Sequence, residues 1–178
     1  MNATECIKGR RSIRAFEEKP VSHELIEQLI ETASMAPSWK NTQVTRYIAV
    51  EGAAKDALAK CTNIWAGNGN IINGAPVVIA ICAISGRSGY ERDGSFSTSK
   101  GSGWTMFDAG IATQTFCLAA HEAGLGTVIM GLYDDNAAEV LQIPEGQELV
   151  ALVALGYPAV SPDAPARKSV SDLLTFLS

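Results

Sequence analysis

The chain has 178 residues, of which 47% are hydrophobic and 19% are charged, and its formal net charge at pH 7 is −5. A chain of this length and composition is sufficient for one globular domain with its own hydrophobic core. The net negative charge argues against a general nucleic-acid binder, which needs an excess of Lys and Arg facing the phosphate backbone.

The four cysteines are widely spaced, with no C-x-x-C pair and no nearby histidine at ligand spacing. The pattern therefore predicts neither a zinc site nor a disulfide framework. The first residues lack the apolar stretch of a signal peptide, and the longest apolar run, residues 75–84, is too short to cross a bilayer. We therefore expect a soluble cytoplasmic protein with reduced thiols.

The first half of the chain is predicted to alternate helices with one strand. Thr4 is expected to cap a short helix that Gly9 ends, and Ser22 is expected to cap an amphipathic helix. The predicted elements are a helix over residues 4–8, a helix from Ser22 toward Pro37, a strand over 44–50 and a helix over 53–61.

The second half is predicted to be mixed as well. Residues 76–84 are apolar without alternation, which favours a strand buried on both faces. Small residues in the following helix allow close approach, so we expect a central or dimer-facing position, and Gly124 is expected to end this helix. The predicted elements after 76–84 are a long helix over 105–123, a strand over 126–131, a helix over 136–141 capped by Asp134 or Asp135, and a strand over 149–156.

Two segments outside these elements are expected to matter for function. Residues 85–103 are rich in Ser and Gly and are predicted to form a mobile surface loop, which is either a solvated connector or a lid over an active site. The Pro-rich residues 158–165 lead to an apolar segment, 170–177, that needs a surface to pack against. A partner subunit is a candidate for that surface.

Short basic clusters stand near both ends of the chain. Residues 9–14 (GRRSIR) contain three Arg and one Ser, and Arg167-Lys168-Ser169 forms the second cluster. Guanidinium groups and a hydroxyl on an extended segment can form several charge-assisted bonds to one phosphate, although charge spacing alone favours a solvated basic loop. A fold in which the termini meet would close both clusters around one anion.

The order of motifs resembles the FMN-dependent nitroreductase-like flavoproteins. Residues 10–16 (RRSIRAF) resemble the R-x-S-x-[RK]-x-[FY] element of that family, and residues 36–43 (APSWKNTQ) resemble its A-P-S-x-x-N-x-Q turn. The remaining matches are DAG at 108–110, GLGT at 124–127, GYP at 156–158 and the basic pair Arg167-Lys168.

This resemblance spans nearly the whole chain and implies an α+β fold with a central, mostly antiparallel sheet flanked by helices. It implies one FMN-binding domain over residues 1–178, with 85–103 as the mobile loop. It also implies a homodimer in which the C-terminal segment, residues 159–178, is exchanged and packs on the partner subunit.

The resemblance implies a set of phosphate and sugar contacts for FMN. Arg10 and Arg167, helped by Lys168, are implied to hold the phosphate. Ser12 and Arg14 are implied to reach the ribityl and pyrimidine side. The full set, with Arg11 included although no separate contact is assigned to it, is Arg10, Arg11, Ser12, Arg14, Arg167 and Lys168.

Other implied contacts come from the partner subunit and from the strand over 126–131. The second subunit is implied to contribute a turn to the same flavin, through Pro37, Ser38, Trp39 and Asn41. Met130 and Gly131 match the position where a backbone N–H, that of Gly131, approaches flavin N5. Asn68 matches an Asn that reads the pyrimidine edge, with Asn70 as a competing alignment. Trp39 is expected either at the dimer seam or as a wall of the substrate pocket.

The function implied is an NAD(P)H-dependent flavin oxidoreductase. NADH or NADPH would reduce FMN at N5, and an acceptor such as a nitroaromatic or a quinone would then take its place, which gives ping-pong kinetics. A cation such as Arg14 would raise the reduction potential, and no side chain is required as a general base. No metal is implied.

Two features qualify this function. Residues 43–45 read Gln-Val-Thr where many members of the family have Gln-Pro-Trp, which predicts an open, permissive pocket. The alternative function is a non-catalytic FMN store or sensor, motivated by the flexible composition of residues 85–103.

Overall fold

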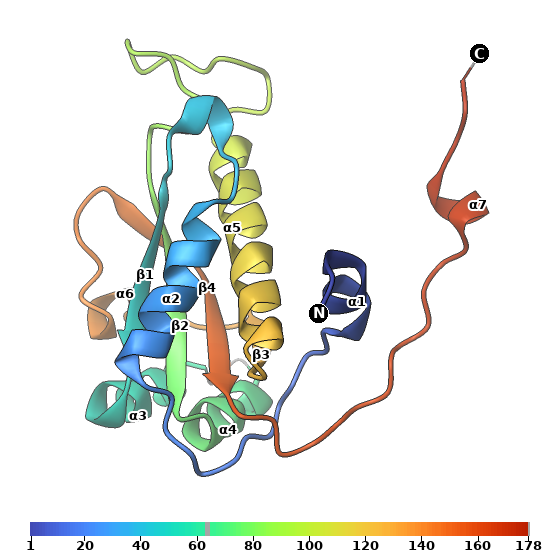
Figure 1. Cartoon of the computed structure of the whole chain (residues 1–178). Coiled ribbons are helices and arrows are strands. Elements are labelled where there is room, and N and C mark those ends of the chain that lie inside the picture. The colour runs from blue at the N-terminus through green and yellow to red at the C-terminus, as the bar shows by residue number, and fades with distance from the viewer. Residues whose placement is uncertain (63–64, 178) are drawn as a thin grey trace.

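A four-stranded antiparallel sheet lies at the centre of the computed structural model, which describes residues 1–62 and 65–177 (Figure 1). The strand order is β1-β2-β4-β3, and each neighbouring pair is antiparallel. The strands are β1 (Thr45–Val50), β2 (Val77–Ile84), β3 (Gly126–Met130) and β4 (Gln147–Gly156). This arrangement confirms the predicted α+β class.

The apolar composition of β2 follows from its central position. It pairs with β1 on one edge and β4 on the other, and helices cover both of its faces, so residues 77–83 have no exposed surface. A strand buried on both faces carries apolar residues without alternation. The prediction for this strand is therefore confirmed to within one residue at its start.

Helices cover both faces of the sheet (Figure 1). On one face α2 (His23–Ser34) and α5 (Gly103–Glu122) pack on side chains such as Ile79, and Phe116 of α5 is completely buried there. On the other face α3 (Gly52–Lys60), α4 (Ala66–Gly74) and α6 (Asn136–Val140) enclose a second core around Val78 and Ile72. The fold thus has three layers, with two apolar cores separated by the sheet.

Several predicted boundaries shift in the structure. The N-cap of α1 (Ala3–Gly9) is Asn2, which forms a capping box with Glu5, so the prediction that Thr4 caps this helix is wrong. Ser22 caps α2 as expected, through a bond from the Leu25 N–H. Gly124 has φ of 79° and follows α5 as predicted.

The helix α4 was not expected from the sequence. Its residues AGNGNIING have low helix propensity. Ile71 and Ile72 on this segment are buried in the second core, so tertiary packing outweighs the unfavourable local preference.

The C-terminal segment leaves the folded body after β4 (Figure 1). Residues 159–177 are exposed throughout, and the short helix α7 (Val170–Leu173) carries apolar side chains into solvent. Phe176 is 87% exposed and Leu177 95%. Within the described residues, no helix has the length and apolar character needed to span a membrane.

Candidate functional site

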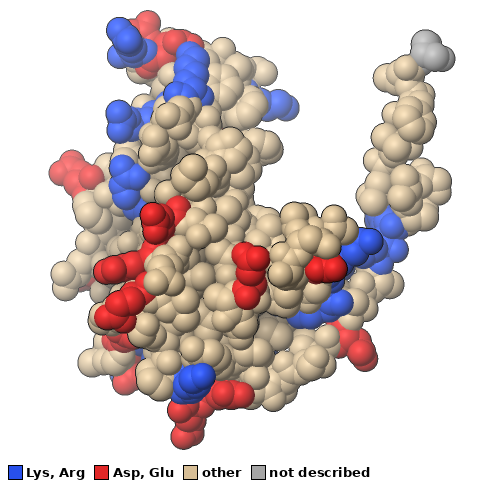
Figure 2. All heavy atoms as spheres, viewed as in Figure 1, with Lys and Arg blue, Asp and Glu red and all other residues tan. Residues whose placement is uncertain are grey.

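The two basic clusters of the chain lie against one pocket. Arg10, Ser12 and Arg14 from the N-terminal segment and Arg167 from the C-terminal segment line this pocket of about 350 Å³, which we call the basic pocket. Its remaining lining residues are Arg11, Pro162, Asp163 and Pro165. Figure 2 shows Lys and Arg side chains gathered where α1 approaches the C-terminal segment. Lys168 is exposed and is not among the lining residues.

The N-terminal half of the basic pocket is fixed by its attachment to the edge of the sheet. Ser12 forms a parallel bridge with Thr127 of β3, and the Ile13 N–H donates to the Thr127 carbonyl at 2.9 Å. The Ile13 side chain is buried against Gly126, where an added Cβ would lie 2.6 Å from Ile13 Cγ1. Because side chains alternate along an extended segment, a buried Ile13 directs Ser12 and Arg14 away from the core.

Arg11 has a structural role at the end of α1. Its Nη1 donates to the carbonyl oxygens of Lys8, Gly9 and Arg10 at 2.7, 3.2 and 3.0 Å. These are the last carbonyls of a helix, which a cation stabilises. The guanidinium therefore has partners within its own segment.

Arg10 differs from Arg11 because part of its guanidinium lacks a partner. Its Nε is buried and has no hydrogen-bond partner among the residues that the structure describes. A buried donor on a charged group without an acceptor is costly, and an anionic ligand would satisfy it. Arg10 is thus the residue of the basic pocket best suited to a phosphate oxygen.

His121 lies next to the basic pocket, near the end of α5. With Arg10 and Arg11 it lines a neighbouring pocket of about 620 Å³. An added Cβ at Gly9 would lie 2.8 Å from His121 Nε2, so the imidazole packs on α1. Burial, together with the positive charges of Arg10 and Arg11, lowers the pKa of His121 below its ordinary value of 6.5.

A strained turn, residues 37–43, lies after α2 and includes the short 3-10 helix Trp39–Asn41. Lys40, Asn41 and Gln43 have φ of 44°, 56° and 48°, a region that non-glycine residues rarely occupy. Within the turn, Ser38 Oγ accepts a hydrogen bond from the Gln43 N–H at 2.9 Å, and the Asn41 side chain is exposed. Each such residue costs of the order of 1–3 kcal/mol, so the surroundings must hold the turn in place.

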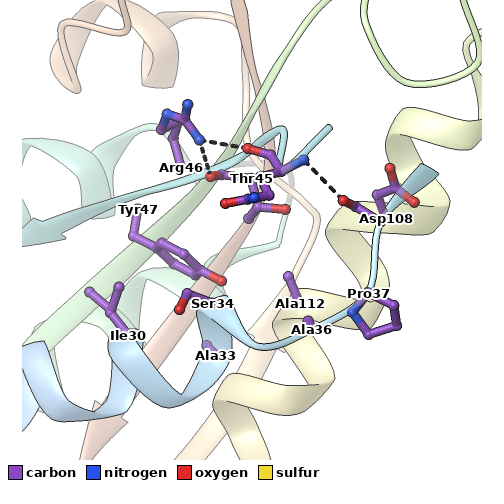
Figure 3. Close-up of a pocket in the computed structure, with 12 residues that line it drawn as sticks. Ile30, Ala33, Ser34, Ala36, Pro37, Thr45, Arg46, Tyr47, Asp108 and Ala112 are labelled. Carbon is purple, nitrogen blue, oxygen red and sulfur yellow. Dashed lines mark hydrogen bonds between the residues drawn. The ribbon is translucent and has the colours of Figure 1, made fainter. Parts of the chain in front are cut away.

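A pocket of about 280 Å³ lies beneath the 37–43 turn (Figure 3). Pro37 and Asp108 stand on one side of it, and Tyr47 of β1 stands on the other. Burial raises the pKa of Tyr47 to about 12. This pocket and the basic pocket have no lining residue in common.

The end of β3 is the third region that the sequence indicated. Met130 is buried in the second core, whereas Gly131 is exposed and an added Cβ there would meet nothing within 4 Å. Asn68 is buried and its Nδ2 donates to the Leu132 carbonyl at 3.2 Å. Of the two competing alignments, Asn68 therefore lies beside the segment that follows β3, and the Asn70 side chain is exposed.

Residues 85–103 make specific contacts with the 37–43 turn and with α5. Ser88 is completely buried and donates to Asp108 Oδ2 at 2.6 Å. Glu91 forms an ion pair with Lys40, in which Lys40 Nζ donates to both carboxylate oxygens at 3.0 and 3.2 Å. Trp104, at the start of α5, packs on Trp39 with ring centroids 4.5 Å apart and ring planes tilted by 46°, and its Nε1 donates to Thr98 Oγ1 at 2.9 Å. The segment thus covers the turn on the side where Trp39 lies.

The structure thus places the sequence-predicted residues in three groups. The first is the basic pocket, the second is the 37–43 turn and the third is the end of β3 with Asn68. Sequence reasoning missed the role of Asp108, which joins the turn to α5 and to residues 85–103. Its signal was an acidic residue in a helix that is otherwise largely apolar.

Comparisons with known proteins agree with this fold. The family model described as "Nitroreductase family" matches residues 7–65 and 51–157. An archaeal relative from Methanothermobacter thermautotrophicus, whose name marks it as a candidate NADH dehydrogenase/NAD(P)H nitroreductase, is 32% identical over 91% of this chain and 80% of its own length. The FMN reductase [NAD(P)H] of Bacillus subtilis is 32% identical over 91% of this chain and 67% of its own length.

A solved structure extends the agreement to three dimensions. A protein from Desulfovibrio desulfuricans, crystallised in complex with FMN, superposes with a TM-score of 0.80 at 28% identity and covers 100% of this chain and 98% of its own. The family model matches most of the chain, and two relatives are 32% identical to it. Both findings support the same family. The chain belongs to the nitroreductase family.

Proposed function

We propose that this protein is an FMN-dependent NAD(P)H oxidoreductase that acts as a homodimer and reduces nitroaromatic, quinone or related acceptors. Membership of the family and the names of its relatives support the enzyme class and the cofactor. The observation that carries the proposal is the basic pocket, in which Arg10, Ser12, Arg14 and Arg167 from opposite ends of the chain converge.

The residues of the basic pocket fit the phosphate of FMN. Several guanidinium groups and a hydroxyl can each bond a different phosphate oxygen, and the buried Nε of Arg10 lacks any other acceptor among the described residues. Arg10 and Arg167 would hold the dianion, and Ser12 would donate to the phosphate or the adjoining ribityl chain. Arg11 would stabilise the end of α1 from which this segment starts.

The exposed end of β3 would receive the reactive part of the cofactor. When bound, FMN supplies hydride transfer, from the nicotinamide to N5 and from N5 to the acceptor. The Gly131 N–H would orient that atom, and the absence of a side chain there permits close approach. Asn68 would fix this segment through its bond to the Leu132 carbonyl, and Arg14 would favour the reduced state by its charge.

A shared site between two subunits would bring the 37–43 turn to the same cofactor. Within one chain, the pocket beneath the turn and the basic pocket share no lining residue. This separation is compatible with a turn that contacts the flavin of the partner subunit. The exposed apolar side chains of residues 170–177 and of Met106 and Phe107 on α5 supply surface for a dimer. The C-terminal segment would then pack on the partner subunit.

A non-catalytic FMN store or sensor is the other candidate from the sequence. Its only argument was an undefined wall at residues 85–103. Ser88, Glu91 and Thr98 give that segment specific partners, so no observation on the described residues favours this alternative.

The proposal is tested with purified protein reconstituted with FMN. Anaerobic titration with NADH and with NADPH is expected to bleach the flavin absorbance with at least one of them, and a panel of nitroaromatics and quinones is expected to restore it. Initial rates should give the parallel double-reciprocal lines of ping-pong kinetics. A protein that binds FMN but stays oxidised would be a store or sensor, and a protein that binds no FMN would contradict the proposal.

A further inference from the structure

The carboxylate of Asp108 is buried and has no cationic partner among the residues that the structure describes. Asp108 is 3% exposed, and neither of the two ion pairs found among the described residues, His23–Glu51 and Lys40–Glu91, involves it. Burying an ionised carboxylate is expensive unless hydrogen bonds stabilise it. The hydrogen bonds that it accepts therefore identify what its charge stabilises.

Asp108 accepts hydrogen bonds from two segments that are distant in the sequence. The Trp39 N–H donates to both carboxylate oxygens at 3.0 Å, and Ser88 Oγ donates to Oδ2 at 2.6 Å. Thr105 Oγ1 donates to the Ser88 carbonyl at 3.4 Å, which holds Ser88 against the same helix. Because Asp108 lies more than one turn inside α5, its side chain is not used to cap its own helix.

The segment held by Asp108 is the strained 37–43 turn. Three of its residues have positive φ, and such a backbone persists only when several contacts determine it together. The bond from the Trp39 N–H ties the middle of the turn to α5, and Arg46 of β1 donates to the Gln43 carbonyl at its far end. The contact of Trp39 with Trp104 of α5 and the ion pair of Lys40 with Glu91 act on the same turn.

We propose that Asp108 is a positioning residue for the cofactor: its carboxylate fixes the 37–43 turn and ties residues 85–103 to it, so that the turn reaches the flavin in one conformation. This inference rests on the proposed function, in which the turn contacts FMN. Asp108 itself touches the turn through the Trp39 N–H and acts on the cofactor through it.

The test compares Asp108→Asn, Asp108→Ala and Ser88→Ala with a matched control on the same helix. Thr113→Val is the control, because Thr113 is also buried in α5 and its hydroxyl donates to the Ala109 carbonyl of the same helix. The measurements are the FMN dissociation constant, the melting temperature and the circular dichroism of the apo protein. Two indoles that lie close together at a tilted angle give an exciton couplet, so the Trp39–Trp104 pair, with ring planes 46° apart, reports the position of the turn before any cofactor is added.

The expected effects on FMN affinity are graded. Asn retains one acceptor for the Trp39 N–H but loses the charge, so the FMN dissociation constant of Asp108→Asn should rise by about tenfold, with a larger rise for Asp108→Ala. Ser88→Ala should raise it by only a few fold. All three variants should lose exciton amplitude in the same order, whereas Thr113→Val should keep both the couplet and the FMN affinity.

Two results would overturn the inference while leaving the proposed function intact. One is wild-type FMN affinity in Asp108→Asn and Ser88→Ala. The other is weakened FMN binding with an unchanged exciton couplet, since Asp108 would then act by a route other than the turn. If the wild-type protein bound no FMN, the proposed function would fail, and the couplet of the apo variants would still decide whether Asp108 positions the turn.

Discussion

The basic pocket and the 37–43 turn differ in how the chain holds them. The basic pocket combines irregular segments from both chain ends, and Arg14 and Arg167 on its rim are exposed. The 37–43 turn is short, strained and attached to a buried carboxylate. A long guanidinium reaches an anion from many backbone positions, whereas a backbone turn must stand in one place. We therefore expect the basic pocket to attract the cofactor by charge, and the 37–43 turn to depend on a buried hydrogen-bond network for its position.

Removal of the C-terminal segment should have the largest effect. A chain that ends at Ala159 keeps the bond from the Ala159 N–H to the Ala15 carbonyl but lacks Arg167 and the exposed apolar residues 170–177. FMN affinity should fall by about a hundredfold or more, because charged bonds and buried dimer surface are lost together. Calorimetry and analytical ultracentrifugation measure the two losses. A truncated protein that stays dimeric with full FMN affinity would show that this segment serves neither purpose.

Loss of one guanidinium of the basic pocket should have the next largest effect. Arg10→Ala removes charged hydrogen bonds of roughly 1.5–3 kcal/mol, so FMN should bind about tenfold or more weakly. Riboflavin, which lacks the phosphate, should bind the variant and the wild type equally. Lys8→Ala is the matched control, since Lys8 is an exposed cation on α1 that does not line the basic pocket. If Arg10→Ala and Lys8→Ala lost FMN affinity equally, the pocket would attract FMN only through its overall positive charge and not through a specific bond from Arg10.

A change inside the turn should have a smaller effect of a different kind. Ser38→Ala removes the acceptor of the Gln43 N–H, a neutral bond of about 0.5–1.5 kcal/mol, and should weaken FMN and riboflavin alike by a few fold. Added salt should weaken FMN binding to this variant as steeply as to the wild type, whereas Arg10→Ala should show a shallower dependence. Titrations at three salt concentrations make this measurement. If Ser38→Ala lost more affinity for FMN than for riboflavin, the turn would also contribute to phosphate binding, and the proposed difference between the turn and the basic pocket would be wrong.

The smallest effect concerns pH near the basic pocket. The folded-state pKa of His121 lies below 6.5, so the unfolded chain binds more protons as pH falls below about 6.5. The free energy of unfolding of the wild type should therefore decline in that range relative to His121→Gln. His23 gives the opposite sign, because its hydrogen bond to Glu51 raises its pKa, and the stabilisation it provides is lost as pH rises through that value. Urea unfolding at a series of pH values checks both, and identical pH profiles for the wild type and His121→Gln would contradict the first.

The sequence was sufficient to predict most of the fold because its strongest patterns are local. The apolar run of β2 and the Ser22 cap of α2 appear where the patterns placed them. The α4 helix could not be predicted, because Gly and Asn dominate its sequence and only the burial of Ile71 and Ile72 against the sheet makes it helical.

The candidate site was predictable where short motifs name residues and unpredictable where contacts cross the fold. The basic and hydroxyl residues that the motifs indicate all line the basic pocket, except Lys168; they are Arg10, Arg11, Ser12, Arg14 and Arg167. By contrast, no motif predicted that Arg11 bonds three backbone carbonyls at the end of α1, or that Arg10 Nε has no such partner among the described residues. The link between Asp108, Trp39 and Ser88 depends on side chains that only the folded chain brings together.

The central claim is that one FMN site takes its basic pocket from one subunit and its turn from the other. The direct test is a heterodimer of an Arg10→Ala chain with a Ser38→Ala/Asn41→Ala chain, purified through two different affinity tags. If the site is shared, one site of the heterodimer carries both defects and the other carries none, so the account predicts one FMN per dimer bound with wild-type affinity. If each subunit holds its own complete site, both sites of the heterodimer are impaired, and the absence of any wild-type site would contradict the claim.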